Sequence, residues 1–177
     1  MNTVSLTAEW DPRPGFKLGQ KDVAGKLTYL GSKVWRHPAL KITDVAKPSI
    51  KDDEVLIEVK ACGICGSDVH MAQPDREGYI LYPGLTAFPV VLGHEFAGVV
   101  AEAGPNAVNK STRRRFAAGE AVCAEEMFWC SYCRPCADGQ PNHCEALQEL
   151  GFSVNGAFSQ YVVINSRYIW SIDDLRQ

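Results

Sequence analysis

The 177-residue chain is predicted to form a β-rich (α+β) domain, either a sandwich or a partly open barrel. Three observations lead to this prediction. The apolar segments are short and contain many β-branched residues, glycine and proline turns separate them, and four cysteines at residues 130–144 mark a small loop-like lobe. A chain of this length buries roughly two-thirds of its unfolded surface, so we expect one hydrophobic core.

The predicted strands are distributed along the whole chain. The run Glu54 to Lys60, E-V-L-I-E-V-K, is a clear strand that leads to Cys65. Apolar residues at 90–92 and 96–100 flank His94, so we expect a strand to give this imidazole a rigid mount. The other predicted strands are residues 4–8, 40–45, 121–124 and 157–164, the last of these being the final strand.

Turn-rich segments are expected between these strands. Residues 11–15, D-P-R-P-G, end the first strand. Residues 71–89 contain three prolines together with Tyr79 and Tyr82 and are predicted to be a loop. Residues 104–119 form another connection, and residues 171–177 resemble the start of a helix.

Composition limits the classes of function. The chain is 46% hydrophobic and 22% charged, with a net charge of -3, which is typical of an ordinary globular domain. Nucleic-acid binding is not expected, because the only basic cluster, Arg113 to Arg115, is interpreted as a solvated loop tip. No segment reaches the roughly 18 apolar residues of a membrane span, and the N-terminus lacks a signal-peptide pattern. We therefore expect a cytoplasmic protein with no membrane partner.

Four of the seven cysteines, Cys130, Cys133, Cys136 and Cys144, have the spacing C-x2-C-x2-C-x7-C. Four thiolates satisfy tetrahedral zinc completely, so this lobe predicts a closed, structural zinc site. An iron–sulfur cluster is the alternative, although the usual C-P ending is missing. Cys62 and Cys123 remain and are interpreted as small buried apolar residues, although Cys62 could compete with Cys65 as a ligand.

A second, open metal site is predicted from the segment C-G-I-C-G-S-D-V-H at residues 62–70 together with Gly93-His94-Glu95. Cys65 offers a thiolate and His94 an imidazole nitrogen, a mixed ligand set that zinc accepts. Polar side chains surround them, namely Ser67, Asp68, His70 and Glu95. Two protein ligands are too few for a closed site, and catalytic zinc usually takes three with a fourth position left open.

These motifs resemble the zinc-containing medium-chain dehydrogenases, the relatives of alcohol, sorbitol and threonine dehydrogenases. The resemblance rests on residues 62–70, on G-H-E-F-A-G at 93–98 and on the four-cysteine lobe, in that order. It implies a GroES-like, partly open barrel over residues 1–177, with an extended N-terminal part (1–38) and a zinc lobe (128–147). We call residues 16–38 the insertion segment. Since no G-x-G-x-x-G pattern occurs, we expect a chain truncated before the family's nucleotide-binding domain.

The resemblance also implies an activity. The complete enzyme would oxidise an alcohol by hydride transfer to NAD or NADP while zinc acts as a Lewis acid. The motif wording is similar to the polyol branch, which implies a secondary alcohol or polyol as substrate. Glu125 and Glu126 are candidate acceptors for its hydroxyls. Family members form homo-oligomers, and this chain alone is expected to be inactive.

Site roles follow from the same resemblance. Ser67 and His70 match a proton relay, Asp68 matches a carboxylate that orients the zinc-bound histidine, and Glu95 matches a glutamate near zinc. The third protein ligand would lie beyond Gln177. Tyr79 and Tyr82 are candidate walls of the substrate cleft, or else surface aromatics that pack their own loop.

Simpler interpretations remain open at this point. His70 and His94 could be ordinary polar residues at strand ends, and Glu95 could be a buried carboxylate paired with a basic residue. As an alternative function, the chain could be a non-enzymatic zinc-binding assembly module with a co-chaperonin-like fold, because fold alone does not choose between these functions.

Overall fold

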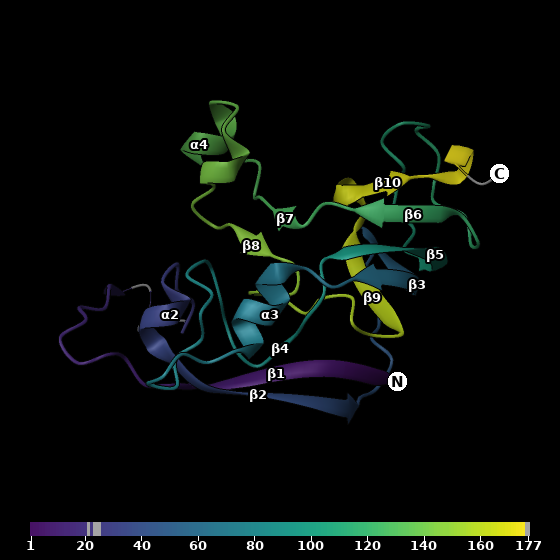
Figure 1. Ribbon diagram of the computed structural model, residues 1–177. Coiled ribbons are helices and arrows are strands. Elements are labelled where there is room, and N and C mark those ends of the chain that lie inside the picture. Colours follow the sequence, from purple (N-terminus) through teal and green to yellow (C-terminus); the bar gives the residue numbers. More distant parts are fainter. Residues whose placement is uncertain (21, 23–25, 176–177) are drawn as a thin grey trace.

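Antiparallel strands build three sheets in the computed structural model, which describes residues 1–20, 22 and 26–175 (Figure 1). The strands are β1 (Asn2–Trp10), β2 (Trp35–Asp44), β3 (Glu54–Gly63), β4 (Val90–Val91), β5 (Glu95–Ala103), β6 (Ala121–Ala124), β7 (Met127–Phe128), β8 (Gln148–Glu149), β9 (Tyr161–Asn165) and β10 (Ile169–Ser171). The helices are α2 (Gly31–Val34), α3 (Gly66–Ala72) and α4 (Arg134–Ala137), with 3-10 turns η1 (Pro141–His143), η2 (Ser166–Tyr168) and η3 (Asp173–Leu175). The prediction of a β-rich domain is confirmed.

The largest sheet has five strands in the order β10-β6-β5-β3-β9. Its strands alternate buried and exposed positions because one face covers the main hydrophobic core. Buried members of that core include Val55, Ile57, Val100, Val122 and Ile164. β3 and β5 pair over most of their length, from Val55 opposite Ala103 to Gly63 opposite Glu95, and this long register places the ends of both strands beside each other. Cys65 follows the end of β3, and His94 and Glu95 lie at the start of β5.

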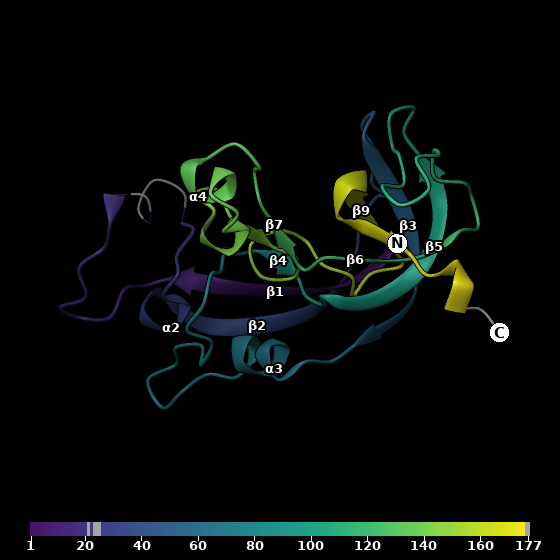
Figure 2. The same cartoon turned by 90° about the horizontal axis from the view of Figure 1, so that it is seen from above.

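The second sheet, β2-β1-β4, is a long ribbon. It begins at the N-terminus with β1 and includes β4, the strand that precedes His94. β1 and β2 pair from Asn2 opposite Asp44 to Trp10 opposite Trp35, with an irregularity between Thr7 and Glu9. Figure 2 shows α3 on one side of this ribbon and α4, with the cysteine lobe, on the other. No helix among the described residues is long and apolar enough to cross a membrane.

The described part of the insertion segment packs against the rest of the chain. Trp35 begins β2 and packs edge-to-face on Trp10 and Phe88, with ring centroids 4.9 Å apart in both pairs. Thr28 and Thr86 form a β-bridge with N–H···O distances of 3.2 and 2.9 Å. Residues 21 and 23–25 of the insertion segment lie outside the described residues.

Several element boundaries differ from the prediction. Residues 157–164 are not the final strand, because β9 begins only at Tyr161 and β10 follows it. Residues 171–177 do not begin an α-helix: the Ile172 N–H donates to the Ala121 carbonyl, which extends the sheet pairing, and only the 3-10 turn η3 follows. Residues 176–177 lie outside the described residues. Met71 and Ala72, predicted as loop, belong to α3.

All three arginines are exposed, as the interpretation of a solvated loop tip requires, but Arg115 also contacts the backbone. The Arg115 guanidinium donates to the backbone carbonyls of Gly104, at 3.0 Å, and Ala103. It therefore ties the connection between β5 and β6 to the end of β5, while the residue as a whole stays exposed, like Arg113 and Arg114.

Gly98 gives a direct test of the β3–β5 register. A Cβ at this buried glycine of β5 would lie 2.4 Å from the Glu58 carbonyl oxygen of β3. We expect Gly98→Ala to lower the free energy of unfolding by about 2 kcal/mol, because the strand pair would have to separate. Urea unfolding measures this.

Gly66→Ala is the matched control, since no atom lies within 4 Å of its added Cβ. Equal stability of the two variants would contradict the register described here.

Candidate metal centres

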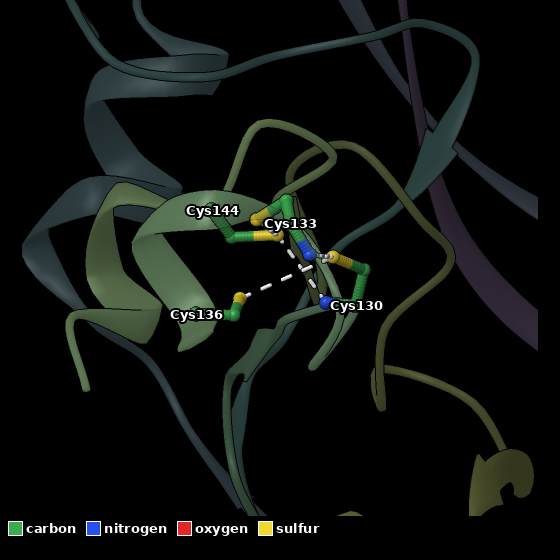
Figure 3. A group of neighbouring side chains, drawn as sticks. All are labelled: Cys130, Cys133, Cys136 and Cys144. Atoms are coloured by element: carbon green, nitrogen blue, oxygen red, sulfur yellow. Dashed lines mark hydrogen bonds between the residues drawn. The ribbon is translucent and has the colours of Figure 1, made fainter. Parts of the chain in front are cut away.

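The four cysteines of the lobe converge on one point (Figure 3). The Cys130 and Cys136 sulfurs are 4.0 Å apart, and the Cys133 and Cys144 sulfurs are 3.9 Å apart. A tetrahedral zinc with Zn–S bonds of about 2.3 Å needs sulfurs about 3.8 Å apart. Both of these distances are close to that value, so the four sulfurs fit a tetrahedral zinc, and they leave no open position.

Backbone N–H groups point at the sulfurs of this lobe. Cys130 N–H donates to the Cys144 sulfur at 3.2 Å, and Cys133 N–H donates to the Cys130 sulfur at 3.3 Å. Burial opposes ionisation, but amides of Tyr132 and Cys133 lower the pKa of the Cys130 thiol to about 6. Amide donors that favour a thiolate are what a metal-binding cysteine requires.

A second group of metal-binding side chains consists of Cys65, His94 and Glu95, whose ligand atoms all lie within 4.8 Å of one another. Cys65 follows β3 at the N-terminus of α3, and Glu95 is the first residue of β5. His94 lies between β4 and β5 and not within a strand. The two strands that flank it are held in their sheets, and they fix its position from both sides. The structure therefore brings together the three residues that the sequence predicted around an open zinc site.

Glu95 is exposed, so the alternative of a buried carboxylate with a basic partner is wrong. Its side chain lies against Gly63, where an added Cβ would be 2.9 Å from a Glu95 carboxylate oxygen. Gly63 thus leaves room for this carboxylate beside Cys65. His94, in contrast, is only 6% exposed.

Asp68 connects the two segments that carry the donors. Its carboxylate accepts the Cys65 N–H at 2.9 Å and the Gly93 N–H at 3.3 Å. One of its oxygens also lies 3.7 Å from Nδ1 of His94, a buried nitrogen that lacks a hydrogen-bond partner among the described residues. Because Nδ1 faces Asp68, Nε2 is the nitrogen available to a metal.

Ser67 and His70 lie on α3 beside this group. The Ser67 hydroxyl is 3.5 Å from Nε2 of His94 and is half-buried. His70 lies one helical turn farther along and is exposed to solvent. The helix thus places one hydroxyl at the donors and one imidazole at the surface.

Aromatic side chains support the buried histidine. The Phe152 ring lies 4.7 Å from the His94 ring and 4.9 Å from the Tyr82 ring, measured between centroids. Burial first, then the charges of Glu149, Glu126 and Cys65, raise the pKa of Tyr82 to about 12. Tyr82 is therefore near the donor group, as expected of a cleft wall.

Tyr79 has a different environment. It is 4% exposed, and the Arg13 guanidinium lies over its ring at 4.0 Å from the centroid. Arg13 also pairs with Asp75 and Glu77. Tyr79 therefore belongs to a packed cluster that attaches the chain after β1 to the loop after α3.

Two residues near the site were missed by sequence reasoning, namely Phe152 and Glu149. Burial, then the nearby Glu126, raises the pKa of Glu149 to about 7. No spacing motif includes either residue, because they reach the site through the pairing of β7 with β8 and the turn that follows it. Glu125 accepts the Trp170 indole N–H at 2.7 Å through one of its two carboxylate oxygens.

Cys62 and Cys123 belong to neither group of ligands. Both are half-buried, and Cys62 packs against the main core. Burial, followed by the nearby Asp68 carboxylate, raises the pKa of Cys62 to about 11, which makes it a weak metal ligand.

Comparison with known proteins gives one family. The model of the alcohol dehydrogenase GroES-like domain matches residues 51–174. The scyllo-inosose 3-dehydrogenase of Thermotoga maritima is 65% identical over 176 residues, which cover 99% of this chain and 45% of that protein. The chain therefore spans a little under half the length of this relative.

Solved structures agree with this likeness. An alcohol dehydrogenase structure from Thermotoga maritima superimposes with a TM-score of 0.94 at 65% identity, over 98% of this chain and 44% of the other. A short chain alcohol dehydrogenase of Escherichia coli CFT073, solved with the cofactor NADH, gives a TM-score of 0.61 at 29% identity, over 97% and 38% of the two chains. The predicted GroES-like architecture is confirmed.

Asp68 is predicted to control metal affinity at the second group. We expect Asp68→Asn to weaken zinc binding there by about tenfold to 100-fold, because the amide cannot accept both backbone N–H groups and still face His94. Competition with a zinc chelator measures the affinity of each site for zinc. The lobe's zinc is the internal control, and loss of both zincs together would mean general misfolding.

Glu149 is predicted to make stability depend on pH. Its pKa rises from 4.5 to about 7 on folding, so its stabilising effect is present below pH 4.5 and is lost as the pH rises through 7. The unfolding free energy of the wild type should therefore fall relative to Glu149→Gln over this range. Glu145→Gln, on an exposed residue, should show no such trend. Parallel pH profiles of wild type and Glu149→Gln would contradict the raised pKa.

Proposed function

Because the chain belongs to the alcohol dehydrogenase GroES-like domain family, we propose that it is the catalytic domain of a zinc-dependent oxidoreductase. The reaction is oxidation of a secondary alcohol or polyol, with hydride transfer to NAD or NADP. The observation that carries this proposal is the pairing of a closed group of four cysteines with an open group of three different donors. A structural site needs no open position, whereas a catalytic zinc does.

The two metal sites have different tasks in this proposal. Residues 128–147 hold a structural zinc through the four cysteines, and Cys65, His94 and Glu95 hold a catalytic zinc. A zinc ion bound by the second group supplies Lewis-acid activation of the substrate hydroxyl. A further ligand would come from the part of such an enzyme that this chain does not include, since the chain spans 45% of its Thermotoga relative.

The polar residues of α3 then transfer the proton of the substrate hydroxyl. The Ser67 hydroxyl, at 3.5 Å from Nε2 of His94, accepts the proton of the substrate hydroxyl and passes it on. His70, exposed one turn away, delivers that proton to solvent. Asp68 fixes the orientation of His94 and holds the Cys65 segment in place. The carbon-bound hydrogen leaves as hydride to the nicotinamide, so the substrate is oxidised by two electrons.

A cyclic polyol is the substrate class that we favour. The Thermotoga relative at 65% identity is named for the inositol-type ketone scyllo-inosose. The NADH complex of the Escherichia coli relative at 29% identity supports a nicotinamide cofactor. As with other members of this family, we propose a homo-oligomer for the complete protein. An assembly module without catalysis has no use for the Cys65 group, so this alternative is less well supported.

A chimera tests the proposed function. This chain would be joined to the remaining part of the Thermotoga scyllo-inosose 3-dehydrogenase, and polyol-dependent reduction of NAD and NADP would be followed by absorbance. We expect turnover, and we expect Cys65→Ser to reduce it by at least about 1000-fold while lobe zinc is retained, because loss of a ligand removes the catalytic metal.

Cys123→Ser is the matched control, because Cys123 is also half-buried but belongs to neither donor group. Turnover that survives in Cys65→Ser would refute the metal assignment. A chimera that folds, holds two zincs and turns over no alcohol would refute the proposed reaction.

A further inference from the structure

Residues 74–80 form a tight hairpin within the loop that follows α3, which we call the loop hairpin. The Asp75 N–H donates to the Tyr79 carbonyl at 2.7 Å, and the Gly78 N–H donates back to the Asp75 carbonyl at 3.1 Å. One carboxylate oxygen of Asp75 also accepts the N–H groups of Glu77 and Tyr79, both at 2.9 Å. Asp75 therefore fixes the turn with one oxygen, and its other oxygen bonds outside the loop hairpin.

Arg13, in the chain after β1, is the partner of that second oxygen. Its guanidinium pairs with the Asp75 and Glu77 carboxylates, and its Nε donates to the Ser32 carbonyl of α2 at 3.1 Å. The guanidinium carbon also lies 4.0 Å from the centroid of the Tyr79 ring. The Arg13 and Asp75 side chains are only 24% and 28% exposed, so salt screens this pair less than a pair on the open surface. Arg13 therefore joins the chain after β1, α2 and the loop hairpin at one point.

The residues after the loop hairpin return to the C-terminal end of α3. The Leu81 and Tyr82 N–H groups both donate to the His70 carbonyl, at 2.9 and 3.1 Å, and the Leu81 N–H also reaches the Gln73 carbonyl at 3.2 Å. Carbonyl groups in the last turn of a helix lack partners within the helix. These two amides supply such a partner, so they hold the backbone of His70.

The end of α3 depends on this support. The helix has 7 residues, and an isolated helix of that length is not stable in water. Asp68 fixes its N-terminal end through the Cys65 N–H, whereas the His70 side chain near its C-terminal end is exposed. The position of the His70 imidazole therefore depends on the bonds between its backbone and the loop.

We propose that Arg13 is a positioning residue for His70. Through Asp75 it holds the loop hairpin, and the Leu81 and Tyr82 amides that follow hold the outer end of the proton relay. Arg13 itself is not one of the metal-binding donors. This inference rests on the proposed function, because the proton-transfer task of His70 belongs to it. It gives the N-terminal part of the chain a role in the reaction.

The first measurement is amide hydrogen exchange of the zinc-loaded 177-residue chain, followed by NMR. Arg13→Met removes the charge, while Arg36 and the β2 backbone still bond to the loop hairpin, so we expect this variant to fold. The Leu81 and Tyr82 amides should exchange about tenfold faster, because the loop opens more often. Arg114→Met, at an exposed arginine, is the matched control and should change neither amide. Unchanged exchange of both amides in Arg13→Met would overturn the inference.

The second measurement is turnover of the chimera at pH 7 with Arg13→Met, His70→Ala and both changes together. We expect Arg13→Met to lower kcat about fivefold with KM unchanged, and to lower it no further once His70 is absent. Arg13→Lys, which keeps the charge, should restore part of the loss.

Equal factors of loss with and without His70 would mean that Arg13 acts on the fold in general, and would overturn the inference. A wild-type chimera that turns over no alcohol would overturn the proposed function and this inference together. Unchanged amide exchange, in contrast, overturns the inference alone.

Discussion

The arrangement of the second metal group depends on one buried carboxylate. Asp68, only 3% exposed, accepts N–H groups from Cys65 and Gly93 and lies beside Nδ1 of His94. Asp68 therefore bonds to a segment 25 residues away, at the point where β3 ends and β5 begins. A buried carboxylate is stable only where donors surround it, so these donors and the carboxylate hold each other in place. The candidate ligands Cys65 and His94, and Ser67 beside them, are positioned from this one point.

A row of packed aromatic side chains extends from His94 toward the N-terminal part of the chain. Phe152 packs on the imidazole, Tyr82 packs on Phe152, and the loop of Tyr82 carries the insertion segment through the Thr28–Thr86 bridge. The insertion segment is therefore linked to the Cys65–His94–Glu95 group through the Thr28–Thr86 bridge and the packed rings of Tyr82, Phe152 and His94.

Sequence reasoning identified what depends on local spacing. The four cysteines and the motifs around Cys65 and His94 were found because metal ligands recur at short intervals. It could not find Glu149 or Phe152, because neither lies in a spacing motif and the β7–β8 pairing that precedes Phe152 has two residues in each strand. It also missed α3, since Ser67 and Asp68 were interpreted as ligand-surrounding polar groups, while Asp68 in fact caps the helix through the Cys65 N–H. Glu125 and Glu126 were chosen as candidate acceptors, and the sequence could not show that Glu125 accepts the Trp170 indole N–H.

In the proposed function, one domain holds both a closed and an open zinc site. Anomalous diffraction at the zinc edge, from crystals of the chain grown with zinc, tests this most directly. We expect one peak with four sulfur ligands inside the Cys130–Cys144 lobe and a second peak among Cys65, His94 and Glu95 with at least one non-protein ligand. A single peak in the lobe at saturating zinc, with the Cys65 group ordered and empty, would contradict it.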